Sequence, residues 1–156
     1  MTKVENIAVV TGGRADFGLL SKLCQILDND NRVKLTVIAT GSHLSDSHGY
    51  TLKEVEAFGY TNVETIDLNI CGDTRENINV YISTSISKFS VFFSSRQIKK
   101  ILVLGDRYEI FGASIAAAIL GIKIAHIHGG EVTEGAFDEF MRHSITKMPS
   151  LHFVER

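Results

Sequence analysis

The chain has 156 residues, of which 44% are apolar and 22% are charged, and this size and composition fit one compact globular domain. Its net charge of −2 gives no electrostatic reason to expect nucleic acid or an anionic membrane surface as a partner. The two cysteines, Cys24 and Cys71, form no CxxC pair, and no apolar run is long enough for a signal peptide or a membrane span. We therefore expect a cytoplasmic domain.

Short apolar runs alternate with helical patterns along the chain. The runs are rich in β-branched residues and end at glycines or polar loops, which is typical of buried strands. Strands are predicted at residues 7–11, 33–40, 63–68, 101–104, 123–127 and 151–154. Helices are predicted from Asp16 onward, at residues 52–58, at residues 75–95, along an apolar stripe of Tyr108, Phe111, Ile115 and Ile119, and at residues 137–148.

This alternation predicts an α/β fold, a doubly wound, Rossmann-like parallel sheet with helices on both faces. Right-handed crossovers leave few topologies, and strand order 3-2-1-4-5-6 is the first choice. In that order the chain reverses direction between strands one and four. A ligand crevice is then expected between the loops at residues 12–18 and 105–109, with the loop at residues 129–138 beside them.

The turn after the first predicted strand reads TGGRADFG, from Thr11 to Gly18. It matches neither G-x-G-x-x-G nor a P-loop, and the second strand lacks the acidic residue that would hold a nicotinamide ribose, so we set NAD and ATP aside. A glycine turn at a helix N-terminus favours an anion, and Arg14 adds a positive charge suited to a diphosphate. Alternatively, the glycines only shape the turn and Asp16 only caps the helix.

The fourth predicted strand is followed by LGDRYE, residues 104–109. Asp106 lies there at the expected crevice, where a carboxylate could act as an acid or a base once its surroundings shift its pKa. Asp106 could equally be the N-cap of the next helix. In the same way, Arg107 and Glu109 could form an ion pair that holds the loop.

Ionisable side chains crowd together after the fifth predicted strand. His126 and His128 share a strand face, and Glu131 and His143 could complete a metal site. However, His126 lies inside an apolar run and could equally be a packed strand histidine. Asp138, Arg142 and His143 lie at helical spacings, so one helix face could point into the crevice or could be a solvated face with an ion pair between Asp138 and Arg142.

Four motifs of the chain resemble those of the UDP-N-acetylglucosamine 2-epimerases. In chain order they read TGGRADFG, GSH (residues 41–43), LGDRYE and HIHGGEVTEGAFDEFMRHSITKM (residues 126–148). The resemblance is to the hydrolysing branch, which makes N-acetylmannosamine or a close analogue for sialic-acid-type sugars. The non-hydrolysing branch typically has GTRPE in the first loop, where this chain has Gly13-Arg14-Ala15-Asp16.

The resemblance implies a glycosyltransferase-B-type fold of two Rossmann-like domains with the active site between them. Residues 1–156 are then the N-terminal domain only, without the C-terminal domain that supplies most uridine and diphosphate contacts in the family. We expect the full-length protein to be a homo-oligomer that binds a UDP-sugar. We also expect the chain by itself to be folded but inactive, because its candidate residues line only one wall of the cleft.

The family chemistry accounts for the crowded ionisable residues. The resemblance implies loss of UDP together with the carbon-2 proton, which gives 2-acetamidoglucal, followed by addition of water with the opposite configuration at carbon 2. The product is N-acetylmannosamine or a 2,4-diacetamido-6-deoxy analogue. These steps need a base, an acid and activation of water, and they imply no metal and no organic cofactor.

The family roles carry over to this chain by position. Asp106, His128 and Asp138 occupy the places of the acid/base carboxylates. Several relatives carry Glu where this chain has His128, so either His128 transfers the proton, which its pKa permits, or Glu131 takes that role. Arg14 is expected to approach the diphosphate. Further substrate contacts are expected from Ser42, His43, Arg107 and His143.

Two other classes of protein remain open from the sequence. The first is a metal-dependent hydrolase built on His126, His128 and Glu131, which metal analysis of the pure protein would separate from an epimerase. The second is a nucleotide-binding module without chemistry, which turnover by the full-length protein would exclude.

Overall fold

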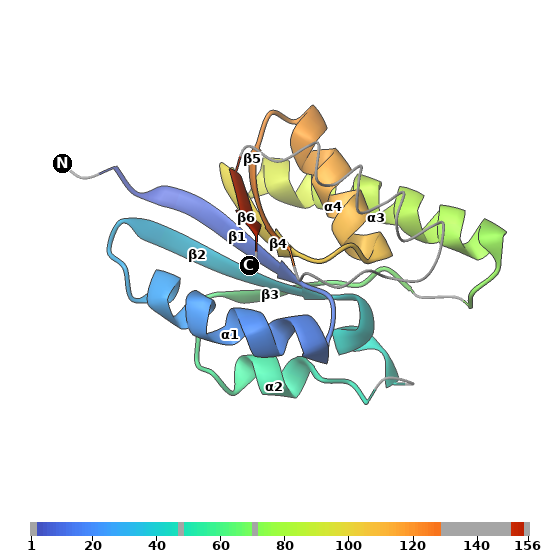
Figure 1. Ribbon diagram of the computed structural model, residues 1–156, viewed down its shortest axis with the longest axis horizontal. Coiled ribbons are helices and arrows are strands. Elements are labelled where there is room, and N and C mark those ends of the chain that lie inside the picture. The colour runs from blue at the N-terminus through green and yellow to red at the C-terminus, as the bar shows by residue number, and fades with distance from the viewer. Residues whose placement is uncertain (1–2, 47–48, 70–71, 129–150, 155–156) are drawn as a thin grey trace.

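The computed structural model describes residues 3–46, 49–69, 72–128 and 151–154. Their strands form one six-stranded sheet in the order β3-β2-β1-β4-β5-β6. Every neighbouring pair of strands is parallel (Figure 1). The predicted doubly wound order is therefore confirmed, with the first strand between the second and the fourth.

The elements follow one another as the apolar pattern predicts. The strands are β1 (Glu5–Thr11), β2 (Val33–Thr40), β3 (Val63–Ile66), β4 (Lys100–Leu104), β5 (Lys123–His128) and β6 (Leu151–Val154). The helices are α1 (Arg14–Asp28), α2 (Leu52–Glu56), α3 (Arg75–Ser95) and α4 (Tyr108–Ile119), with a short 3-10 helix η1 (Gly41–Leu44) after β2. The helix predicted at residues 137–148 lies outside the described residues. Within the described residues, no helix is both long and apolar enough to cross a bilayer.

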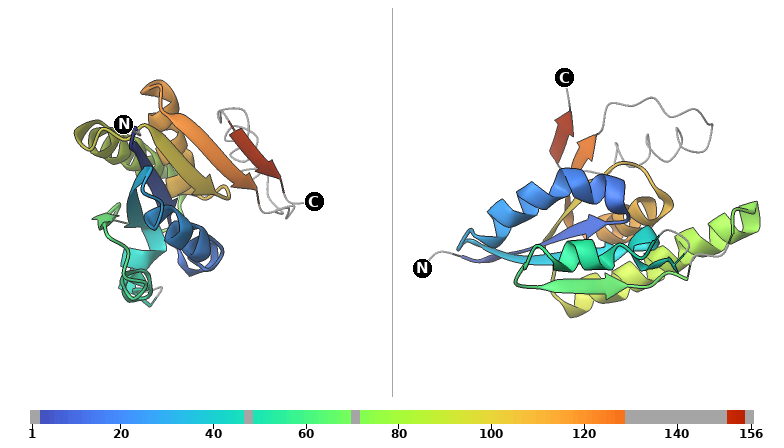
Figure 2. Two further views of the ribbon diagram at one scale, coloured as in Figure 1. Left: turned by 90° about the vertical axis from the view of Figure 1, so that its left-hand side faces the viewer. Right: turned by 90° about the horizontal axis from the view of Figure 1, so that it is seen from below.

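Helices α1 and α2 cover one face of the sheet, and α3 and α4 cover the other (Figures 1 and 2). Successive strand residues point to opposite faces, so Ala8 and Val10 pack toward α3 and α4 while Val9 packs toward α1. In β4, Val103 likewise packs toward α3 and α4, while Leu102 packs toward α1. Because both faces are buried, the strands read as continuous apolar runs.

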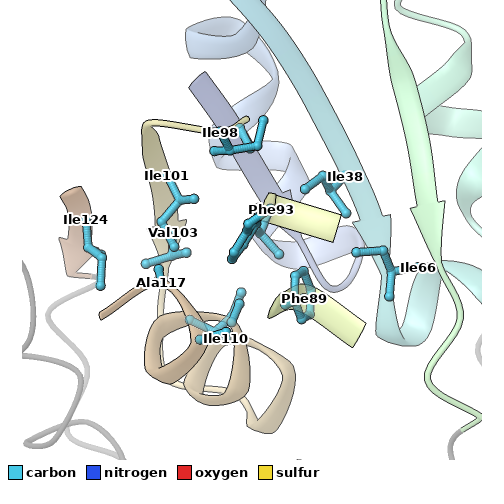
Figure 3. Close-up of a cluster of buried hydrophobic side chains, with 14 of the residues drawn as sticks. Ile38, Ile66, Phe89, Phe93, Ile98, Ile101, Val103, Ile110, Ala117 and Ile124 are labelled. Atoms are coloured by element: carbon cyan, nitrogen blue, oxygen red, sulfur yellow. The ribbon is translucent and has the colours of Figure 1, made fainter. Parts of the chain in front are cut away.

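The larger core lies between the sheet and α3 and α4, where Phe89 and Phe93 are buried among the strand side chains (Figure 3). Each fully buried side chain of this size contributes roughly 1.5–3 kcal/mol. Helices α3 and α4 meet at Gly112, where an added Cβ would lie 2.4 Å from the Cβ of Ser85. Only glycine permits this close approach.

The predicted apolar stripe of α4 is wrong in one respect. Ile119 at its end is 78% exposed, and Tyr108 and Phe111 are only partly buried beside the core. The helix instead buries mostly small residues, namely Gly112, Ala113, Ser114, Ala116 and Ala117, together with Glu109 and Ile110. Small residues occupy this face because α4 packs closely against both α3 and the sheet.

Candidate active site

Three polar loops meet at the carboxyl edge of the sheet, as the parallel strand order requires. The Gly12 carbonyl, after β1, accepts a hydrogen bond from the Ser42 N–H of η1 at 2.8 Å. The Ser42 hydroxyl accepts one from Arg107 Nη2, after β4, at 3.2 Å. The two loops expected to flank the crevice are therefore neighbours. The loop at residues 129–138, which was expected beside them, lies outside the described residues.

Asp16 fixes the turn between β1 and α1. Its carboxylate accepts the Thr11 hydroxyl at 2.6 Å, the Gly12 N–H at 3.0 Å and the Gly13 N–H at 3.2 Å. The Asp16 side chain is almost fully buried, and these hydrogen bonds use both of its carboxylate oxygens to hold the turn. Gly13 is the N-cap of α1, so Asp16 stabilises the start of the helix from the third helical position rather than as the N-cap. The positive end of the α1 dipole lies at the carboxyl edge.

His43 lies behind this turn and is fully buried. Its Nε2 is 2.8 Å from the Thr11 hydroxyl, and its Nδ1 is 2.7 Å from the Thr51 hydroxyl. Because the Thr11 hydroxyl donates to Asp16, its oxygen is left to accept a hydrogen bond from His43 Nε2–H.

Burial lowers the pKa of His43, while the carboxylates of Asp16 and Glu54 act in the opposite direction. The structure thus places His43 in the interior, where its ring contacts the Thr11 hydroxyl. A direct contact between His43 and a substrate stays a prediction.

The ion pair between Arg107 and Glu109 is present. Arg107 Nε donates to Glu109 Oε1 at 2.8 Å, and the Tyr81 hydroxyl donates to Oε2 at 3.1 Å. The Glu109 side chain is 1% exposed and that of Arg107 is 57% exposed. The carboxylate raises the pKa of the Arg107 guanidinium, which therefore stays charged. Burial, and then Glu109, raise the pKa of Tyr81, which remains a neutral donor.

Arg14 and Asp106 lie at the same edge in more open positions. Arg14 is the first residue of α1, its side chain is 76% exposed, and its Nε is 3.3 Å from a Glu54 oxygen. Exposed pairs of this kind are weak, so Arg14 can turn toward an anion. Asp106 is partly buried in the loop after β4, and Arg107 rather than Asp106 occupies the N-cap of α4.

His126 is a packed strand histidine, which was one of the two interpretations of this residue. It is 1% exposed, and its Nε2 donates to the Gly105 carbonyl at 2.9 Å, which ties β5 to the loop after β4. Across the described residues, no three or more His, Cys, Asp or Glu side chains are grouped as metal ligands would be. Other candidates lie beyond the described part of the chain, namely the side chain of His128 and the residues Glu131, Asp138 and His143.

Sequence reasoning missed two residues of this arrangement, Thr11 and Tyr81. Thr11 ends an apolar strand, and its hydroxyl gains a role only because η1 places His43 beside it. Tyr81 lies within an Ile- and Phe-rich helix, 28 positions from the carboxylate to which it donates. Thr11 opens the TGGRADFG motif, but the motif gives its hydroxyl no role, and no local signal marks Tyr81.

The fold and the site define a Rossmann-like domain that presents polar loops to a ligand at the carboxyl edge of a doubly wound sheet. Residues 25–156 match the sequence model of the family described as UDP-N-acetylglucosamine 2-epimerase. The chain belongs to this family.

Two curated relatives illustrate the similarity. Over 151 residues the chain is 38% identical to polysialic acid biosynthesis protein P7 of Escherichia coli. This match covers 97% of this chain and 39% of the Escherichia coli protein. It is 37% identical to the GDP/UDP-N,N'-diacetylbacillosamine 2-epimerase (hydrolyzing) of Campylobacter jejuni. That match covers 95% of this chain and 38% of the Campylobacter protein. The chain thus spans about two fifths of the length of these relatives.

A solved structure supports the fold. The UDP-GlcNAc 2-epimerase of Neisseria meningitidis bound to UDP-GlcNAc superposes with a TM-score of 0.77 and 23% sequence identity, over 96% of this chain and 39% of that one. The described sheet therefore has the architecture of the first half of a glycosyltransferase-B-type epimerase, as predicted.

Proposed function

We propose that this chain is the N-terminal domain of a hydrolysing UDP-N-acetylhexosamine 2-epimerase. The whole protein would convert UDP-N-acetylglucosamine, or a UDP-2,4-diacetamido-6-deoxy analogue, to UDP and the free 2-epimeric sugar. Family membership supports the epimerase class, and the name of the Campylobacter relative supports the hydrolysing branch. The observation that carries the proposal is the meeting of the α1 N-terminus, Arg107 and Asp106 at one edge of the sheet.

The diphosphate of the substrate is assigned to the α1 end of this edge. The helix dipole and the N–H groups of the first turn favour an anion there. Arg14 begins the same helix, and Arg107 is held next to it through Ser42. Two guanidinium groups suit an oxygen-rich dianion, and they would stabilise the negative charge that develops on UDP as it leaves.

The reaction is assigned to the sugar side of the edge. In the elimination, a base removes the carbon-2 proton, the electron pair forms the double bond between carbons 1 and 2, and the bond from carbon 1 to the UDP oxygen breaks. In the hydration, an acid delivers a proton to carbon 2 from the opposite face while water adds to carbon 1. Asp106 is proposed as one of these groups, with His128 or Glu131 and Asp138 as the others. The helper role of His143 is proposed with them.

Product analysis by NMR tests the proposal. The full-length protein is incubated with a panel of UDP-sugars in D2O, and we expect free UDP and a free 2-epimeric sugar with deuterium at carbon 2. Retention of the nucleotide on the epimerised sugar would instead indicate the non-hydrolysing reaction. Release of neither product from any UDP-sugar would contradict the proposal.

A chelator experiment tests the absence of metal chemistry. Because the proposed steps are proton transfers and the breaking of one carbon–oxygen bond, we expect excess EDTA to leave turnover unchanged. The matched sample receives EDTA already saturated with zinc. Loss of activity that is restored by zinc or iron would support the metal-dependent hydrolase instead.

A further inference from the structure

Glu109 is a buried carboxylate beside the site, and the proposed reaction gives it no role. It lies in the first turn of α4 and is 1% exposed. A buried charge is costly unless it is paired and hydrogen-bonded, so its surroundings show what it does.

Both carboxylate oxygens have a partner. Oε1 accepts Arg107 Nε at 2.8 Å, and Oε2 accepts the Tyr81 hydroxyl at 3.1 Å. The same guanidinium donates from Nη2 to the Ser42 hydroxyl at 3.2 Å. Arg107 is therefore held on its inner side at two points, from α4 and from η1, while the side chain as a whole is 57% exposed.

Two glycine turns enclose the carboxylate. A Cβ added to Gly12 would lie 2.1 Å from Oε1, and one added to Gly41 would lie 3.1 Å from it. Gly41 also has a φ of 60°, which glycine adopts without strain. The backbone after β1 and β2 thus packs directly against Glu109, while Tyr81 approaches from α3. These contacts fix the position of the Glu109 carboxylate.

We propose that Glu109 is a positioning residue that fixes the Arg107 guanidinium at the carboxyl edge, and that Tyr81 in turn orients Glu109. This inference rests on the proposed function, in which Arg107 meets the substrate diphosphate. A long arginine side chain loses rotamer freedom when it binds a ligand, and one that is already held in place loses less. Glu109 therefore strengthens UDP binding without touching the nucleotide.

Calorimetric titration of the full-length protein with UDP tests this role. We expect Glu109→Gln to weaken binding about tenfold and Tyr81→Phe to weaken it about threefold, since each removes part of the support of Arg107. The matched control is Glu64→Gln. Glu64 accepts Arg96 Nε at 3.0 Å in an ion pair between β3 and the end of α3, away from the carboxyl edge, and its loss should leave UDP binding unchanged.

A double mutant separates positioning from general stability. If Glu109 acts through Arg107, then Arg107→Ala combined with Glu109→Gln should bind UDP no more weakly than Arg107→Ala alone. A further loss in the double mutant would overturn the proposal, as would a folded Glu109→Gln protein with unchanged affinity. If Glu109→Gln does not fold, the same cycle is run with Tyr81→Phe and is judged in the same way.

An NMR readout keeps this inference distinct from the proposed function. The Arg107 Nε–H signal, assigned by its absence in Arg107→Lys, should exchange slowly with water in the wild type and faster in Glu109→Gln and Tyr81→Phe. If the wild type binds no UDP but shows this pattern, the proposed function fails and the positioning role stands. Equally fast exchange in the wild type and the variants would overturn the positioning role.

Discussion

At the scale of single residues, three of the described acidic side chains at the carboxyl edge lie in different settings. Asp16 accepts hydrogen bonds from the backbone of the first turn, and Glu109 accepts hydrogen bonds from Arg107 and Tyr81. Asp106 lies in the loop between β4 and α4 and is partly buried. Asp106 is the proposed acid/base group among the three, and its partial exposure leaves it accessible to a substrate.

Replacing Asp106 by Asn is therefore expected to lower kcat of the full-length protein by about 10²–10⁴-fold, the usual loss for an acid/base group. Asparagine has almost the same shape, so the thermal midpoint should change little. The rate of UDP release and the thermal midpoint are measured on the same preparation. Activity within a few-fold of the wild type, together with a clear loss of stability, would show that Asp106 is a structural residue.

His43 is expected to make stability depend on pH. Its folded-state pKa lies below the ordinary histidine value of about 6.5, chiefly because of burial, so the unfolded chain takes up the proton first as the pH falls. Protonation therefore favours unfolding from the unfolded-state pKa downward, until the pH reaches the lower folded-state pKa. The free energy of unfolding should decrease as the pH drops through this window.

Urea denaturation between about pH 8 and pH 5 checks this expectation on the wild type and on His43→Gln. The variant should lose roughly 1–3 kcal/mol at pH 8 because buried hydrogen bonds are broken. Its stability should then fall less steeply with pH than that of the wild type. Equal slopes would mean that His43 does not titrate in this range.

At the scale of elements, the packing of α4 against α3 depends on one glycine. A Cβ at Gly112 would lie 2.4 Å from the Ser85 Cβ and 3.3 Å from the Ile82 carbonyl, so the two helices would have to separate. We expect Gly112→Ala to lower the free energy of unfolding by about 1–3 kcal/mol, the usual cost of overpacking. Chemical denaturation measures the change.

Gly18→Ala in α1 is the matched control. Apart from the neighbouring backbone of α1 itself, no atom of the described residues lies within 4 Å of a Cβ built there, and alanine favours helix more than glycine does. This variant should gain up to about 1 kcal/mol. Loss of stability in both variants, or in neither, would show that the contact between α3 and α4 at Gly112 does not determine the change in the free energy of unfolding.

At the scale of the whole molecule, the described residues form a sheet covered on both faces, and in the proposed function they present one side of a substrate site. The curated relatives are about two and a half times as long as the matched segment. In the proposed function the remaining part of the enzyme supplies most of the nucleotide contacts and excludes water from the sugar. One domain without the other would therefore lack much of the binding surface.

Residues 1–156 produced alone are accordingly expected to fold but to bind UDP no more tightly than about millimolar, roughly −4 kcal/mol. Circular dichroism checks the fold, and calorimetry with the full-length protein alongside checks the affinity. Micromolar binding by the isolated residues, or release of UDP from a UDP-sugar by them, would show that these residues hold a complete site.

The sequence by itself determined the topology. Unbroken apolar runs such as residues 33–40, separated by helical patterns, leave few ways to bury both faces of a sheet, and the handedness of the crossovers selects among them. The same pattern brings the first glycine turn and the loop with Asp106 to one edge. The motif resemblance then indicates the family without any coordinates.

Only the tertiary structure decided which side chains meet at that edge and which face of α4 is buried. Periodicity marks apolar residues, but it cannot show that α4 packs so closely that small residues are preferred and Ile119 is left 78% exposed. Nor can it show that Tyr81 reaches Glu109, or that Gly12 leaves room for that carboxylate. These contacts join residues far apart in the chain, and their geometry is set by how closely the elements pack rather than by local preference.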